Sequence, residues 1–280
     1  MKCKKKYTIK LEQLRTDLDD YKKSRFVHSD KLMYDGINVN DRDRLITEIK
    51  NYIKDNDVIN TETIINKLFP TKTPHLFISH KSEDAKEAIT LANILHSKFG
   101  IESFIDSQVW HHINDIQKIL DEEFSKKSEN LYDYKKSNIV SSNIFSMLSS
   151  SLYRTIDDSD GFIYIDRNDA HEDIGISKSN MVNIKTESPW IYLENIYTNS
   201  LRIKKHNRER IILEKSGLNN YAADSQVSIE ERKEPKFIYS TNLVNAVKIK
   251  SLNNAFNVQY DKTKKHPLEG LDYFYNIILV

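Results

Sequence analysis

Apolar residues in the first quarter of the chain recur at the spacing of amphipathic helices. Residues 8–24, 40–55 and 61–68 each carry apolar side chains every three or four positions. Pro74 lies just beyond the third segment, where this pattern ends. The spacing predicts a small helical N-terminal region over residues 1–73. Packing or self-association is the simplest role for such a region, and a three-helix nucleic-acid reader is the alternative.

After Pro74, short apolar runs alternate with longer amphipathic segments. Five runs have the length and polar borders of buried strands, at residues 75–80, 101–106, 161–166, 210–214 and 237–241. Helical spacing is found at about 82–99, 114–125, 139–157, 188–204 and 267–279. This alternation predicts an α/β fold in which a central parallel five-stranded sheet is flanked by helices. We expect one domain over residues 74–280, with polar insertions at about 126–138 and 167–187.

The charge balance argues against some classes of partner. The chain has 42 basic and 41 acidic side chains, which gives a formal net charge of +1. Such a chain, without a basic stripe, has no field to hold a nucleic-acid backbone, and this disfavours the nucleic-acid reader. The single cysteine, Cys3, allows no intrachain disulfide. No apolar run approaches the ~20 residues of a membrane helix, and no secretory signal is visible. We therefore expect a cytoplasmic protein without a membrane or nucleic-acid partner.

Candidate chemistry gathers where the predicted strands end, because ligands of open parallel sheets bind beyond the carboxyl ends of the strands. Polar and aromatic residues follow the first two strands and open the helix predicted from residue 188: Ser79, His80, Lys81, Asp106, Ser107, Trp110, Ser188, Trp190 and Glu194. Groups after the first strand could bind a ribose or phosphates, with Lys81 offsetting phosphate charge. Trp110 could stack on an adenine or a partner, or pack in the core. No metal site is predicted, since the adjacent His111 and His112 would point different ways.

The segment from Ser188 to Glu194 combines a helix start with a carboxylate. Ser188 stands where an N-cap would, and Pro189 falls at the first helical position, which proline favours. Trp190 and Glu194 are four residues apart and so share one helix face. That face would offer a ribose an aromatic platform and a carboxylate. Core packing of Trp190 and an inert, exposed Glu194 are the plain alternatives.

Several of these motifs resemble those of TIR (Toll/interleukin-1 receptor) domains. FISHKSEDAKEA followed by GIESFID is similar to the first strand, first helix and second strand of that family, and SPWIYLE to its Ser-x-Trp-x-x-x-Glu signature. FIDSQVW, YDYKKSN and SMLSSSLYRTID are closer still to a group of bacterial TIR-like proteins. The resemblance covers roughly residues 75–205. It implies a flavodoxin-like TIR domain whose BB loop follows the second strand, although WHHIND (110–115) lacks the glycine typical of that loop.

The resemblance also implies an activity. Bacterial and plant TIR domains cleave NAD⁺ to nicotinamide and ADP-ribose or a cyclised or conjugated ADP-ribose. In anti-phage systems such as Thoeris, this product signals to a separate effector. NAD⁺ would then be the substrate, with no cofactor, Glu194 the catalytic residue and the other candidates its binding residues. We also expect a homo-oligomer, because a neighbouring subunit completes the site in many TIR enzymes. A non-catalytic TIR scaffold is the alternative, and a nucleosidase or nucleotide transferase for another nucleoside is a third.

Overall fold

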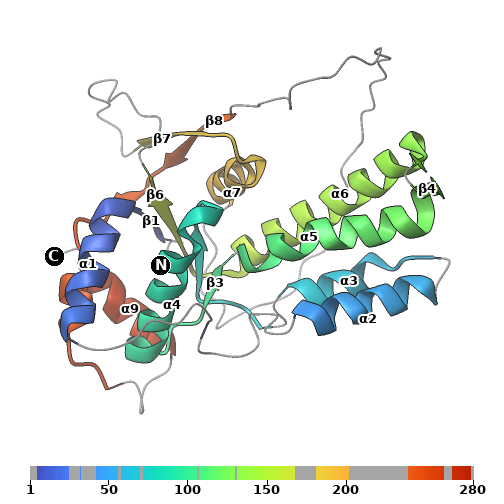
Figure 1. The fold of residues 1–280 in the computed structure, drawn as a ribbon. Coiled ribbons are helices and arrows are strands. Elements are labelled where there is room, and N and C mark those ends of the chain that lie inside the picture. The colour runs from blue at the N-terminus through green and yellow to red at the C-terminus, as the bar shows by residue number, and fades with distance from the viewer. Residues whose placement is uncertain are drawn as a thin grey trace, which may run out of the picture.

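A central parallel sheet of five strands organises the protein. The structure is a computed structural model that describes residues 5–24, 32, 42–55, 58–69, 72–105, 107–129, 131–167, 181–201, 239–261 and 267–278. The sheet order is β3-β2-β6-β1-β9, and all neighbouring strands are parallel. The strands are β1 (Lys5–Lys10), β2 (Leu76–Ser79), β3 (Ser103–Ile105), β6 (Gly161–Asp166) and β9 (Val247–Lys248). Helices flank this sheet (Figure 1), so the predicted α/β fold is confirmed.

Two of the three interior strands, β2 and β6, are buried on both faces, as continuous apolar runs predict. All four residues of β2 and all six residues of β6 are buried. Register partners in a parallel sheet point to the same face, so Ser79, Tyr164 and Thr8 share one face. Tyr7 points to the other face and stacks on Tyr275, with ring centroids 5.1 Å apart. Successive residues of each strand therefore point alternately to the two faces of the sheet.

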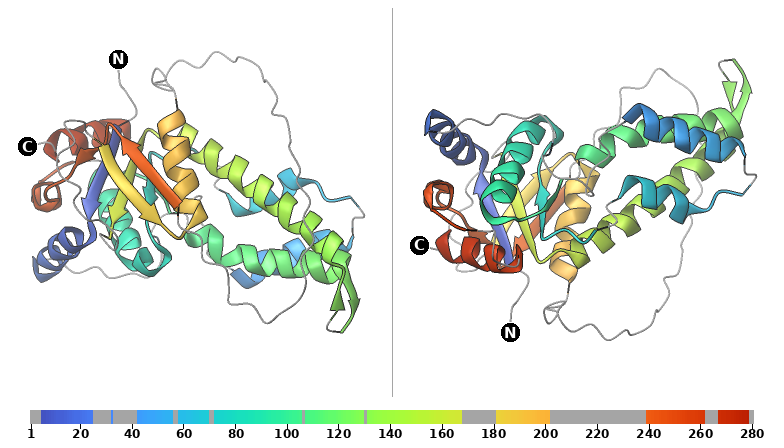
Figure 2. Two further views of the ribbon diagram at one scale, coloured as in Figure 1. Left: turned by 90° about the horizontal axis from the view of Figure 1, so that it is seen from above. Right: turned by 90° about the horizontal axis from the view of Figure 1, so that it is seen from below.

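Different helices cover the two faces. Four of them lie on the side to which Tyr7 points: α1 (Leu11–Ser24), α4 (Ala85–Phe99), α8 (Asn253–Asn257) and α9 (Pro267–Ile277). The opposite face carries α7 (Pro189–Ser200), which lies beside the two-stranded sheet of β7 and β8 (Figure 2). Gly100 follows the helical pattern of residues 82–99, a position typical of a C-cap glycine, and it ends α4 in the left-handed conformation, with φ of 71°.

The N-terminal region is not wholly helical, contrary to the prediction. Residues Lys5–Lys10 form β1, which lies between β6 and β9, and α1 begins only at Leu11. Ile9 has helical spacing to the apolar residues after it, which is why the pattern suggested a helix from residue 8. Tyr7 and Ile9 instead alternate as in a strand, and both are completely buried. The N-terminal region thus contributes a strand to the sheet that we expected to begin after it.

The last of the five predicted strands does not belong to the central sheet. Residues 210–214 lie outside the described residues. Residues 237–241 overlap β8 (Tyr239–Val244), which pairs antiparallel with β7 (Met181–Thr186) in a separate sheet. An apolar run does not reveal which strand will be its partner. The order β3-β2-β6 matches the beginning of a flavodoxin-like sheet, and β1 and β9 take the two remaining positions.

Four of the described helices form an arm that extends away from the sheet (Figures 1 and 2). This helical arm consists of α2 (Arg42–Lys54), α3 (Thr61–Leu68), α5 (Ser107–Leu120) and α6 (Tyr134–Asp158). A π-helical turn (Asp121–Ser125) and a hairpin of β4 (Lys126–Ser128) and β5 (Leu131–Tyr132) connect α5 to α6. The predicted insertion 126–138 is therefore this hairpin and the first turn of α6. Within the described part of the chain, no helix is long and apolar enough to cross a membrane.

Candidate functional site

Two residues singled out by the sequence meet at the carboxyl end of β2. The hydroxyl of Ser79, the last residue of β2, donates a hydrogen bond to Oε2 of Glu194 on α7. Both side chains have an exposed fraction of 0%. They lie 115 residues apart in the sequence, so the fold and not local structure brings them together. This hydrogen bond gives the Glu194 carboxylate a fixed position at the edge of the sheet where ligands are expected.

The start of α7 is built as the sequence predicts. The hydroxyl of Ser188 accepts a hydrogen bond from the backbone N–H of Ile191 (3.3 Å), and Pro189 is the first helical residue. The backbone N–H of Ser188 donates to Oγ1 of Thr186, at the end of β7 (3.0 Å). This capping fixes where the helix begins and therefore which side chains of α7 face the sheet. Glu194 is one of them.

Polar side chains are buried between α7 and the sheet. Besides Ser79 and Glu194, this polar layer contains Thr8 of β1 and Asn195 and Thr198 of α7, all at most 3% exposed. Among the described residues, Oδ1 of Asn195 and Oγ1 of Thr198 have no hydrogen-bond partner. Burying polar groups is costly, and a helix that served only for packing would present apolar side chains here. The polar layer therefore marks this interface as a candidate functional site.

A lysine connects α7 to the sheet at a second point. Lys6 of β1 donates a hydrogen bond from Nζ to Oδ1 of Asn199 (3.2 Å). Burial lowers the pKa of Lys6 below its ordinary value, because desolvation disfavours the charged ammonium. Together, Ser79 and Lys6 hold α7 against β2 and β1.

Trp190 contacts the helical arm. Its ring packs against Phe145 of α6, with centroids 5.4 Å apart and an interplanar angle of 34°. Two turns further along α7, Tyr197 contacts Tyr153 of α6 edge-on, at 5.2 Å. Both aromatic pairs stabilise the contact between α6 and α7. The described geometry thus gives Trp190 a packing role against α6.

His80 and Lys81 follow Ser79 and lead towards α4. His80 is buried, and its Nδ1 lies 3.3 Å from the backbone oxygen of Ile78. Lys81 is half-buried, and its backbone oxygen accepts a hydrogen bond from the N–H of Asp84 (2.8 Å). The three predicted residues after the first strand are therefore adjacent, and Ser79 is the one that donates a hydrogen bond to Glu194.

A charged cluster surrounds Asp84, which the sequence analysis did not identify. The Asp84 carboxylate is completely buried and lies 3.5 Å from Arg15 of α1 and 3.9 Å from Arg167, which follows β6. The same two arginines also pair with Glu87 (2.7 Å) and Glu83, respectively. Desolvation by burial raises the pKa of Asp84, and Arg167 opposes this shift. The cluster ties α1, α4 and the end of β6 together.

The residues predicted after the second strand are only partly described. Asp106 lies outside the described residues. Ser107 and Trp110 have a helical backbone in the first turn of α5, but their side chains are not described. The helix predicted from residue 114 therefore begins earlier, at the position where a loop was expected.

Other members of the polar layer were missed by the sequence analysis. Thr198 does carry a signal, since it lies four positions after Glu194 and so shares its helix face, whereas Asn195, one position after Glu194, does not. Thr8 carried none, because its strand was read as a helix. Within the described residues, no group of three His, Cys, Asp or Glu side chains could hold a metal ion. No protein-family model, curated protein or solved structure matches this chain.

Proposed function

We propose that this protein is a bacterial TIR-type enzyme that cleaves the nicotinamide–ribose bond of NAD⁺, with Glu194 as the catalytic carboxylate. The observation that carries the proposal is the hydrogen bond from Ser79 to the buried Glu194. It unites two residues of separate TIR-like motifs, FISH and SPWIYLE, at the carboxyl end of a parallel sheet. The product, ADP-ribose or a cyclised or conjugated form, would serve as a signal to an effector in anti-phage defence, or its formation would deplete NAD⁺.

The chemistry of this bond requires little more than one fixed carboxylate. Cleavage of an N-glycosidic bond passes through an oxocarbenium-like state, and a nearby carboxylate stabilises the developing positive charge. The nicotinamide of NAD⁺ is already cationic, so it can leave without a general acid. Ser79 would act as a positioning residue that holds the Glu194 carboxylate in one orientation. Asn195 and Thr198 offer further oxygens to hydroxyl groups of the substrate.

The burial of Glu194 places a condition on this reaction. A carboxylate with no exposed surface cannot contact NAD⁺ in the described arrangement. Groups that cover it must therefore move when the substrate binds, as in enzymes whose sites close around the substrate. Activity would then depend on a trigger or on assembly with a second copy.

The test is mass spectrometry of the products after incubation of the purified chain with NAD⁺, with and without extract of phage-infected cells. Wild-type protein is expected to release nicotinamide, and Glu194→Gln to release it about 10³-fold more slowly. Glu187→Gln is the matched control, because Glu187 is exposed just before α7. A folded Glu194→Gln variant as active as the control would refute the role of Glu194. A panel of other nucleosides and nucleotides tests the related nucleosidase or transferase.

A non-catalytic scaffold is the second candidate, and one observation favours it. Large apolar side chains are exposed near the far end of the helical arm, including Leu131 (57%), Tyr134 (80%) and Ile139 (54%). In a scaffold, the hydrogen bond between Ser79 and Glu194 would serve stability alone. Glu194→Gln would then lower the unfolding midpoint, and no trigger would produce nicotinamide from the wild type. Sedimentation velocity at several concentrations would show whether the chain self-associates.

A further inference from the structure

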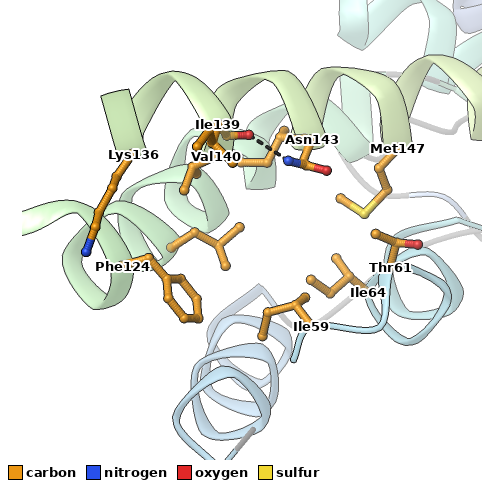
Figure 3. A pocket seen from close by; sticks show the side chains of 11 residues that line it. Ile59, Thr61, Ile64, Phe124, Lys136, Ile139, Val140, Asn143 and Met147 are labelled. Atoms are coloured by element: carbon orange, nitrogen blue, oxygen red, sulfur yellow. Dashed lines mark hydrogen bonds between the residues drawn. The ribbon is translucent and has the colours of Figure 1, made fainter. Parts of the chain in front are cut away.

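The helical arm contains a cavity between α3, α5 and α6. The cavity has a volume of about 390 Å³. Its lining residues come from these helices and from the segments next to α3 and α5: Ile59, Thr61, Ile64, Leu120, Phe124, Lys136, Ile139, Val140, Asn143, Ile144 and Met147. Figure 3 shows their side chains surrounding a common space. Protein interiors are normally close-packed, with few voids larger than a water molecule. This space is therefore large enough to be a binding site rather than a packing defect.

The chemistry of the lining selects apolar ligands. Eight of the lining side chains are aliphatic, aromatic or thioether groups. One polar member, Asn143, donates from Nδ2 to the backbone oxygen of Ile139 (2.8 Å) and so has its donor partly engaged (Figure 3). Cavities with apolar walls stay dry and accept apolar molecules. The core of a helix bundle is also a common place for such a site.

The shape favours a slender ligand over a protein partner. Five of the apolar lining residues are nearly buried: Ile64 (1%), Leu120 (8%), Val140 (9%), Ile144 (5%) and Met147 (6%). The surface that a ligand can touch therefore comes mainly from the more exposed members of the lining, such as Ile139 (54%). A volume of about 390 Å³ accommodates one hydrocarbon chain, whereas a folded partner would need a broader surface.

One end of the cavity carries a positive charge. In Figure 3, Lys136 and Thr61 lie at opposite ends, with apolar side chains between them. Lys136 is exposed and belongs to the first turn of α6, where its backbone N–H donates to Oδ1 of Asp133 (3.1 Å). An anionic group at this end would therefore be stabilised.

We propose that this cavity binds the acyl chain of an anionic amphiphile, with its carboxylate at Lys136. The chain lies among the apolar side chains of α3, α5 and α6 and ends towards Thr61. This binding does not depend on NAD⁺ cleavage, so either property can fail without the other. Ligand binding links α3 to α6 and thereby stabilises the helical arm.

The test uses isothermal titration of the full chain with dodecanoate and with dodecylammonium, both below their micelle concentrations. One equivalent of dodecanoate is expected to bind, with at least about fivefold higher affinity than dodecylammonium. Lys136→Glu is expected to reduce dodecanoate affinity about tenfold. Lys135→Glu is the matched control, because Lys135 is the exposed neighbour that does not line the cavity. Its affinity should stay within about twofold of the wild type.

A second variant tests the cavity itself. Met147→Trp fills the space and is expected to abolish dodecanoate binding while circular dichroism stays unchanged. The proposal is overturned if dodecanoate does not saturate one site, if both amphiphiles bind equally, or if Lys135→Glu and Lys136→Glu weaken binding equally. It is also overturned if Met147→Trp dissociates a dimer of a wild type that binds no dodecanoate, since the cavity would then be an interface between copies. Should Met147→Trp not fold, the two lysine variants decide.

Discussion

The central sheet and the helical arm both contain buried side chains, but the two regions differ in which side chains are buried and in how tightly these are packed. Under α7, polar groups such as Ser79, Glu194 and Asn195 are enclosed at 0% exposure. In the helical arm, apolar groups such as Ile64 and Met147 border unfilled space. The sheet can hold polar groups because strand register and helix capping fix where each one lies. The four helices of the arm lie outside the central sheet, so the shape of the arm depends on how these helices pack. We therefore expect position to matter in the sheet and volume to matter in the arm.

Removing a buried isoleucine should cost more in the sheet than in the arm. Ile163 of β6 and Ile64 of α3 are 0% and 1% exposed. Ile163→Ala should lower the free energy of unfolding by about 4 kcal/mol, and Ile64→Ala by about 2 kcal/mol. Ile64 already borders empty space, so its truncation loses fewer contacts. Urea unfolding of both variants gives the two values. Equal losses would mean that the cavity is filled in solution and would end the comparison.

The rate of NAD⁺ cleavage should depend on how the Ser79 hydroxyl orients the Glu194 carboxylate. Ser79→Ala should reduce nicotinamide release about 10- to 100-fold, because the carboxylate loses the hydroxyl that orients it. The same substitution added to Glu194→Gln should have almost no further effect, since the two residues act as a unit. Product release is followed by mass spectrometry in all four proteins. Independent, additive effects would show that Ser79 does not act through Glu194.

Adding side-chain volume should raise the free energy of unfolding in the helical arm and lower it next to the sheet. Val140→Leu extends a side chain into the arm cavity and should raise the free energy of unfolding by about 0.5–1 kcal/mol. Ala92→Val on α4 adds volume where the side chain is 0% exposed and should lower it by about 1–3 kcal/mol. Thermal and urea unfolding measure both. If Val140→Leu destabilises as much as Ala92→Val, the arm is as tightly packed as the sheet.

The charged cluster at Asp84 should give the smallest effect, visible only as a pH dependence. Burial raises the folded-state pKa of Asp84 above the ordinary value of 3.8. The folded protein therefore holds a proton that the unfolded chain releases, and this contribution to stability is present at low pH and lost as the pH rises through the raised pKa. As the pH rises from 3.8 through the raised pKa of Asp84, the wild type should lose this stability relative to Asp84→Asn. Parallel stability–pH curves for the two proteins would contradict the prediction.

Local signals in the sequence were sufficient for single elements and for selecting the two residues that meet, but not for their contact. Ser188 and Pro189 begin α7, and Gly100 ends α4. These features depend on capping and on glycine conformation, which a short stretch of sequence reveals. Ser79 and Glu194 were each selected from a local motif, whereas the fold brings them together across 115 residues.

Features that depend on distant partners were not predicted. β1 was read as part of a helix because its neighbours, β6 and β9, come much later in the chain. β9 is only two residues long and carries no detectable pattern. The Asp84 cluster needs Arg15 and Arg167 from different elements, and neither is unusual in the sequence. The cavity of the helical arm depends on how helices pack, which periodicity does not determine.

The position of β1 has a consequence for biosynthesis. This strand leaves the ribosome well before its partner strands, which begin only at Gly161 and Val247. Until both have been translated, Tyr7 and Ile9 cannot be enclosed, and they stay available to chaperones or to wrong partners. Contacts between segments this far apart also slow folding. A recombinant fragment that begins at Pro74 would lack an interior strand and expose the edges of β6 and β9. Expression from the first residues of the chain is therefore needed to obtain the intact sheet.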